Sequence, residues 1–151
     1  MLVSILLVDK ADTFRAPIAK FILKKILKDK NLTSYFFVDT AALHGEHEGK
    51  DLTDDAKREL KQNQVPFYLH ESKRVKNSDY EKYDFIVTME DSQIKELINL
   101  FGGDNDMKIR KLLDFAYDSH DIEYPKNGDF SGCFADLQIG CQALLDDILE
   151  K

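Results

Sequence analysis

Residues 2–23 read LVSILLVDKADTFRAPIAKFIL. The first seven of them are almost all aliphatic and end abruptly at Asp9, a pattern typical of a strand that is covered on both faces in a parallel sheet. Pro17 has the fixed φ and the missing N–H that suit the first turn of a helix, and apolar residues follow it at helical spacing. The stretch therefore predicts a strand, a loop at residues 9–16 and then a helix.

The rest of the chain alternates in the same way. Further strands are predicted at residues 34–38, 85–89 and 111–115, and further helices at about 53–62, at about 92–100 and from Phe130 onward. This order predicts an α/β fold, a four-stranded and mainly parallel sheet between two layers of helices, in one domain spanning residues 1–151. Ligands of such folds gather beyond the carboxyl ends of the strands, which directs attention to the loop after the first strand.

Composition and charge exclude several classes of protein. A hydrophobic content of 43% supports an ordinary buried core and excludes fibrous and wholly disordered chains. The 21 basic and 28 acidic residues give a net charge of −7, which argues against binding to nucleic acid or to an anionic membrane. The apolar start is too short for a signal peptide or a membrane span.

The two cysteines, Cys133 and Cys141, are too few for a disulfide scaffold and lack the spacing of a zinc or redox site. On one helix they would lie about 12 Å apart along the axis, too far for a disulfide. We expect two free thiols and a cytoplasmic protein.

The loop after the first strand resembles the signature loop of the low-molecular-weight protein tyrosine phosphatases, C-x-G-N-x-C-R-S-P. The corresponding residues are Asp9, Lys10, Ala11, Asp12, Thr13, Phe14, Arg15, Ala16 and Pro17. Elsewhere Thr40-Ala41-Ala42 is similar to the family's Ser-Ala segment, His70 to its loop-bracing histidine, Met89-Glu90-Asp91-Ser92-Gln93 to M-D-x-x-N, and Lys111-Leu112-Leu113-Asp114-Phe115 to K-L-L-D-F. The resemblance covers nearly the whole chain and implies the three-layer fold of that family.

The resemblance also implies a mechanism, from which this chain departs. In the family a loop thiolate attacks phosphorus, the loop arginine binds the phosphoryl oxygens, and an aspartic acid before a proline protonates the leaving phenol. Arg15 matches the arginine, but Asp9 stands in place of the cysteine and Tyr124 in place of the acid. The loop glycine, asparagine, second cysteine and serine are replaced as well, by Ala11, Asp12, Phe14 and Ala16.

A carboxylate at position 9 would lie within reach of Arg15, where phosphate would otherwise bind. We therefore expect Asp9 to pair with Arg15, to accept loop N–H groups and to disfavour a dianion. This predicts an inactive pseudophosphatase, without metal or cofactor, that binds an unknown protein or small anionic ligand as a monomer or weak dimer. The alternative is residual phosphomonoester hydrolysis that uses Asp9 and Arg15.

Other chemistries fit the sequence less well. Aspartate-nucleophile phosphatases of the haloacid dehalogenase type require D-x-D-x-T and Mg²⁺, and Asp12 comes one place too late for that pattern. Arsenate reductases of the same fold require the loop cysteine. A metal site could be suggested by His44, Glu46, His47 and Glu48, but the segment contains Gly45 and Gly49 and lacks a clear helix to fix ligands on one face. A solvated loop is therefore favoured. For His70 the resemblance implies a brace of the loop, with Thr40 as its hydroxyl partner.

Overall fold

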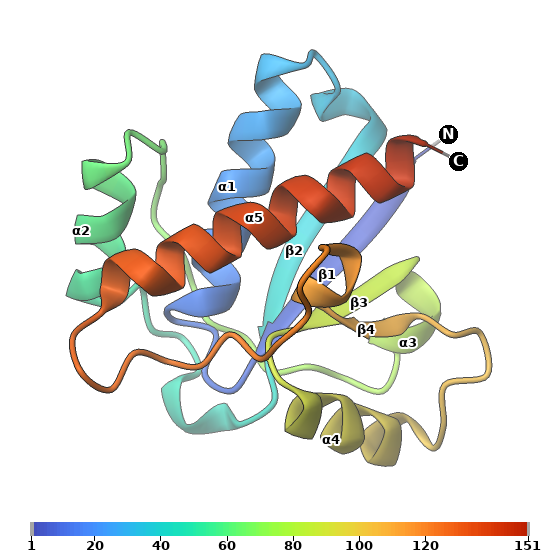
Figure 1. Cartoon of the computed structure of the whole chain (residues 1–151). Helices are drawn as coiled ribbons and strands as arrows, with labels where there is room; N and C mark the ends of the chain where they lie inside the picture. Colours follow the sequence, from blue (N-terminus) through green and yellow to red (C-terminus); the bar gives the residue numbers. More distant parts are fainter. Residues whose placement is uncertain (1, 151) are drawn as a thin grey trace.

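The computed structural model describes residues 2–150, and its centre is a four-stranded sheet in the order β2-β1-β3-β4 (Figure 1). The strands are β1 (Val3–Asp9), β2 (Phe36–Ala42), β3 (Phe85–Thr88) and β4 (Ile109–Lys111). Every pairing in the sheet is parallel. The carboxyl ends of all four strands therefore meet at one edge, where the loop after β1 lies.

Helices cover both faces of the sheet, as the sequence predicts. They are α1 (Arg15–Asp29), α2 (Asp54–Gln62), α3 (Asp79–Lys82), α4 (Asp91–Phe101) and α5 (Phe130–Leu149), with 3-10 turns η1 (Thr33–Tyr35), η2 (Gly45–His47) and η3 (Leu112–Phe115). In Figure 1, α5 runs diagonally across the front of the sheet, beside α1. Among residues 2–150, none of the helices has the length and apolar character needed to cross a membrane.

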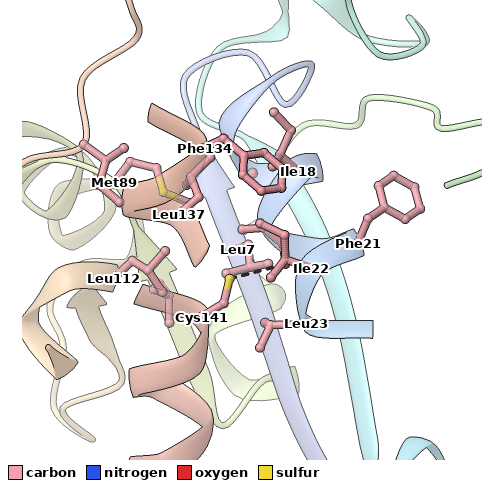
Figure 2. Close-up of a cluster of buried hydrophobic side chains, with 14 of the residues drawn as sticks. Leu7, Ile18, Phe21, Ile22, Leu23, Met89, Leu112, Phe134, Leu137 and Cys141 are labelled. Atoms are coloured by element: carbon pink, nitrogen blue, oxygen red, sulfur yellow. Dashed lines mark hydrogen bonds between the residues drawn. The ribbon is translucent and has the colours of Figure 1, made fainter. Parts of the chain in front are cut away.

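The continuous aliphatic run of β1 serves two cores. Leu7 points to the face that α1 and α5 cover, and Figure 2 shows it packed among side chains of both helices. Leu6, the neighbouring residue, points to the opposite face and belongs to a second cluster with Leu97 of α4. Because both faces of β1 are buried, its sequence shows no polar alternation.

Two predicted strands are displaced. The second starts at Phe36 rather than at residue 34, because residues 33–35 form the turn η1, and it continues to Ala42. The fourth covers Ile109–Lys111 and not residues 111–115, of which all but the first form η3. Asp114 stabilises this turn by accepting the backbone N–H of Lys111 on Oδ2 at 3.3 Å. The apolar run there is therefore a buried turn and not a strand.

The prediction of two free thiols is confirmed. Cys133 and Cys141 lie on the same helix, α5, and both are buried and unpaired with each other. Burial raises the pKa of Cys133 to about 12 and raises the pKa of Cys141 as well. Neither thiol is therefore ionised near neutral pH.

Candidate functional site

The loop between β1 and α1 lies at the floor of a cleft of about 680 Å³. Asp9 is the last residue of β1 and Arg15 the first of α1, so the loop carries both side chains at the sheet edge. Within the loop Asp12 has a φ of 56°, a left-handed conformation that aspartate tolerates better than most residues. Six loop residues line the cleft: Asp9, Lys10, Ala11, Thr13, Phe14 and Arg15. Asp12 and Ala16 are buried and do not line it.

Asp9 and Arg15 form a bidentate ion pair in the floor of this cleft. Asp9 Oδ2 accepts Arg15 Nε at 3.0 Å, and Asp9 Oδ1 accepts Arg15 Nη2 at 2.6 Å. Each of the two side chains is only 5% exposed. The pairing predicted from the sequence is confirmed, and paired N–H···O contacts of this kind are among the strongest that a carboxylate makes.

The rest of the Asp9 carboxylate is also occupied. Oδ1 accepts the backbone N–H of Lys10 at 2.6 Å and the side-chain amide of Gln93 at 3.2 Å. Lys10 supplies the one loop N–H that reaches this carboxylate among the described residues, fewer than the sequence led us to expect. Gln93, in the first turn of α4, supplies the further donor instead.

Arg15 has a second carboxylate partner that the sequence reasoning missed. Its Nη1 donates to Glu90 Oε2 at 2.5 Å and to the carbonyl oxygen of Ile122 at 2.7 Å. Burial by itself would lower the pKa of the guanidinium, but Asp9 and Glu90 outweigh burial and raise it. A signal for this contact was present in the chain order, because Glu90 lies in the short connection between α4 and β3, the strand beside β1.

His70 contacts the loop after β1 through Asp12. Its Nε2 lies 2.9 Å from the carbonyl oxygen of Asp12 and 3.3 Å from Asp12 Oδ1, and its Nδ1 lies 3.0 Å from Lys20 Nζ. An ammonium group can only donate, so Nδ1 accepts and Nε2 carries the hydrogen that Asp12 accepts. Burial lowers the pKa of Lys20, which is held between this ring and Phe21.

The expected partner of His70 is not the one in the structure. Thr40 is buried on β2, but the hydrogen bonds of His70 within residues 2–150 involve Asp12, Lys20 and Asp51. Asp51 accepts the backbone N–H of His70 on Oδ1 at 3.0 Å. Lys20 takes the place expected for Thr40 because α1 passes over the ring and supplies a donor to Nδ1.

Tyr124 forms one wall of the cleft beside Phe14. The two rings meet edge to face with centroids 5.1 Å apart, and Phe130 completes the cluster at 5.6 Å from Phe14. Burial and the nearby charge of Asp55 raise the pKa of the Tyr124 phenol above its ordinary value. The position that resembles the family's acid thus holds a phenol that stays protonated near neutral pH.

Residues 44–48, which hold two histidines and two glutamates, lie at the rim of the cleft. Glu46, His47 and Glu48 are exposed, as expected for a solvated loop, and His44 Nε2 pairs with Glu96 of α4 at 3.0 Å. Over residues 2–150 there is no group of three or more histidine, cysteine or acidic side chains arranged to hold a metal ion. The segment contributes charge and polarity to the cleft mouth.

Comparison with known proteins places this geometry in context. The family model described as low molecular weight phosphotyrosine protein phosphatase matches residues 4–151. The low molecular weight protein-tyrosine-phosphatase YfkJ of Bacillus subtilis is 26% identical over 99% of this chain and 98% of its own length. Its crystal structure superposes with a TM-score of 0.95, covering 99% of this chain and 96% of that one. The human low molecular weight phosphotyrosine protein phosphatase is 24% identical over 95% of this chain and 94% of its own.

Proposed function

Since the chain belongs to the low molecular weight phosphotyrosine protein phosphatase family, we propose that it is a pseudophosphatase, a member that does not turn over phosphate esters and acts by binding. The observation that carries this proposal is the bidentate pair between Asp9 and Arg15. It occupies the loop arginine with an internal carboxylate at the position that resembles the family's nucleophile.

The pair opposes catalysis at the first step, the binding of a phosphoryl dianion. Two unit charges about 4 Å apart at an effective dielectric constant of about 20 repel each other by ~4 kcal/mol. A phosphoryl dianion in the loop would be repelled by the Asp9 carboxylate. It would also have to displace that carboxylate from Arg15. Both effects weaken binding of the group that the family hydrolyses.

The step in which the leaving group departs lacks its proton donor as well. Tyr124 lines the cleft where a leaving group would emerge, but its raised pKa makes it a weaker acid than an ordinary phenol. A positioned general acid typically contributes ~10²–10⁴ in rate, and its efficiency depends on a pKa near the working pH. On this proposal the chain lacks both the nucleophile and the general acid of the reaction, at positions 9 and 124.

What remains is a cleft suited to recognition. Its lining combines apolar surface from Phe14, Leu52 and Tyr124 with charged side chains at the rim. We infer that this cleft binds a segment of another protein in the cytoplasm, whose reducing conditions fit the two buried free thiols. Specificity in a fold of this kind lies in the loops around the strand ends.

The test is hydrolysis of p-nitrophenyl phosphate by the purified protein from about pH 5 to pH 8, the range that spans the titration of ordinary phosphatase groups. The assay is run with and without Mg²⁺, beside an Asp9→Ala variant as the matched control. We expect no turnover above the control. Turnover that disappears in Asp9→Ala would contradict the proposal and show that Asp9 works as a nucleophile or base, and dependence on Mg²⁺ would point to an acyl phosphate.

A further inference from the structure

The two charged side chains in the floor of the cleft neutralise each other. The Asp9 carboxylate and the Arg15 guanidinium bind through two contacts, and each side chain is 5% exposed. Glu90, the second carboxylate on Arg15, is not among the residues that line the cleft. The floor therefore presents a closed ion pair to an incoming group and not a free charge of either sign.

Several backbone N–H groups of the loop have no acceptor. Ala11, Thr13 and Phe14 line the cleft, and within residues 2–150 their N–H groups donate to no protein atom. In this part of the loop only the N–H of Lys10 reaches the Asp9 carboxylate. A backbone N–H without a protein partner needs an acceptor from water or from a ligand. The loop therefore favours a ligand that brings an oxygen atom able to accept hydrogen bonds.

These two features together disfavour charged ligands of both signs. A phosphoryl dianion would be repelled by the Asp9 carboxylate. The side chains of arginine and lysine carry only donors, so they leave the loop N–H groups unsatisfied, and Arg15 repels them. A neutral hydroxyl meets neither obstacle, since its oxygen accepts hydrogen bonds. The side chain of Thr13, which also lines the cleft, can accept the hydrogen of such a hydroxyl.

The wall of the cleft favours an aromatic group. Tyr124 lines the cleft with its side chain 41% exposed, although its ring already packs against Phe14 on one side. Leu52 adds apolar surface to the same cleft. Aromatic rings attract one another in edge-to-face or offset arrangements, beyond what burial of their surface contributes. The exposed part of Tyr124 is therefore a contact surface for a further ring.

We propose that the cleft takes an unphosphorylated tyrosine side chain, presented by a segment of a partner protein. Its ring packs on Tyr124, and its phenol oxygen accepts the unpaired N–H groups of the loop. Asp9 excludes the phosphorylated form, so the cleft selects tyrosine against phosphotyrosine. This inference rests on the proposed function, because it names what the non-catalytic cleft recognises.

The experiment compares three blocked peptides, Gly-Gly-X-Gly-Gly, in which X is tyrosine, phenylalanine or phosphotyrosine. Each is titrated into the full chain, and NMR spectra follow the backbone amides of Ala11, Thr13 and Phe14, which report both affinity and location. We expect the tyrosine peptide to bind about threefold to tenfold more tightly than the phenylalanine peptide, because the hydroxyl adds hydrogen bonds. The phosphotyrosine peptide should bind at least about tenfold more weakly than the tyrosine peptide, because Asp9 repels its charge.

A variant of Asp9 tests the source of the selectivity. Asp9→Asn keeps the size of the side chain and removes its negative charge. Binding of the phosphotyrosine peptide should rise by at least about tenfold, while binding of the tyrosine peptide should change by less than about twofold. Asp118→Asn removes the same charge from an exposed position outside the cleft lining and should change neither affinity.

A variant of Tyr124 tests the wall. Tyr124→Ala should weaken the tyrosine and phenylalanine peptides alike, by about threefold to tenfold, because both lose the ring contact. Tyr117→Ala is the matched control, since Tyr117 is fully exposed and does not line the cleft, and it should leave both affinities unchanged. The comparison of the three peptides uses the natural chain and does not depend on the folding of any variant.

Four results would overturn the inference: equal affinity for tyrosine and phenylalanine, tighter binding of phosphotyrosine than of tyrosine by the natural chain, continued rejection of phosphotyrosine by Asp9→Asn, or no amide shift in the cleft with any peptide at about 10 mM, the range of very weak binding. Each leaves the proposed loss of catalysis intact, because turnover decides that proposal. Conversely, turnover in the phosphatase assay would refute the pseudophosphatase proposal whatever the peptides do.

Discussion

The ring of Phe14 lies edge to face against the ring of Tyr124, with centroids 5.1 Å apart. Phe14 belongs to the loop after β1, and Tyr124 precedes α5, so two segments far apart in the sequence are in contact. Arg15 holds the same segment by donating to the carbonyl oxygen of Ile122. The loop after β1 and the segment before α5 therefore form one packed unit.

This contact predicts energetic coupling between the two rings. In a double-mutant cycle of Phe14→Leu and Tyr124→Leu, the coupling energy should be about 0.5–1.5 kcal/mol, as for other edge-to-face aromatic pairs. Urea unfolding of the four proteins measures it. A matched cycle of Phe14→Leu with Tyr117→Leu, which is fully exposed, should give no coupling. Additive losses for the first pair would show that the rings only lie near each other.

Introducing a cysteine at position 9 and an aspartic acid at position 124 should give strong activity only when the two are combined. Asp9→Cys supplies the thiol, but Tyr124→Asp is needed to protonate a poor leaving group. With phenyl phosphate, we expect Asp9→Cys with Tyr124→Asp to exceed Asp9→Cys alone by about 10² or more in kcat. Asp9→Cys with Tyr124→Asn is the control, since asparagine has a similar shape without a titrating proton. Equal rates for the aspartate and asparagine variants would contradict the assigned role of position 124.

His70, which contacts the loop after β1 through Asp12, should contribute to the free energy of unfolding. His70→Phe removes the contact to Asp12 and leaves the buried ammonium of Lys20 without its acceptor, which should cost about 2–4 kcal/mol in the free energy of unfolding. The same substitution at His120, which is exposed, should change it by no more than about 0.5 kcal/mol. Chemical denaturation measures both values. Similar losses at the two positions would mean that His70 is an ordinary packed residue.

Asp51 should make the free energy of unfolding decrease as the pH falls into the acidic range. Burial works against its charged form, but the N–H groups of His70 and Leu52 and the ammonium of Lys57 outweigh burial and lower the pKa of the carboxyl. A lowered pKa contributes stability above the ordinary value of about 3.9, and the contribution is lost as the pH falls through the lower value in the folded protein.

Asp51→Asn should therefore be less stable than the natural chain at about pH 6, and the difference should shrink as the pH falls below about 4. Thermal unfolding at a series of pH values measures this difference. Asp118→Asn, at an exposed position, provides the control. A difference that stays constant down to the lowest pH would show that the charge of Asp51 is not involved.

The sequence predicted the parts of the molecule that depend on neighbouring residues. The buried β1, the loop and the start of α1 follow from one continuous stretch, and the Asp9–Arg15 pair spans only that loop. The contacts of Glu90 with Arg15 and of Lys20 with His70 join residues 75 and 50 positions apart. Periodicity carries no information on such pairs, because they form only when the fold brings distant segments of the chain together.

The displaced fourth strand has a local cause. Leu112 and Leu113 form an apolar pair that fits a strand by composition, but both side chains are buried in a 3-10 turn. The true strand has three residues, Ile109–Lys111, with a charged residue between its two buried ones. So short a segment gives too weak a pattern to compete with the run beside it.

Binding of inorganic phosphate tests the central claim most directly, because the claim is that Asp9 occupies the site of the anion. Calorimetric titration compares the natural chain with Asp9→Ala and with Asp9→Ala combined with Glu90→Gln, after circular dichroism has shown that all three are folded. We predict no phosphate binding by the natural chain, measurable binding by Asp9→Ala, and tighter binding by the double variant. Phosphate binding by the natural chain as tight as by Asp9→Ala would contradict the account.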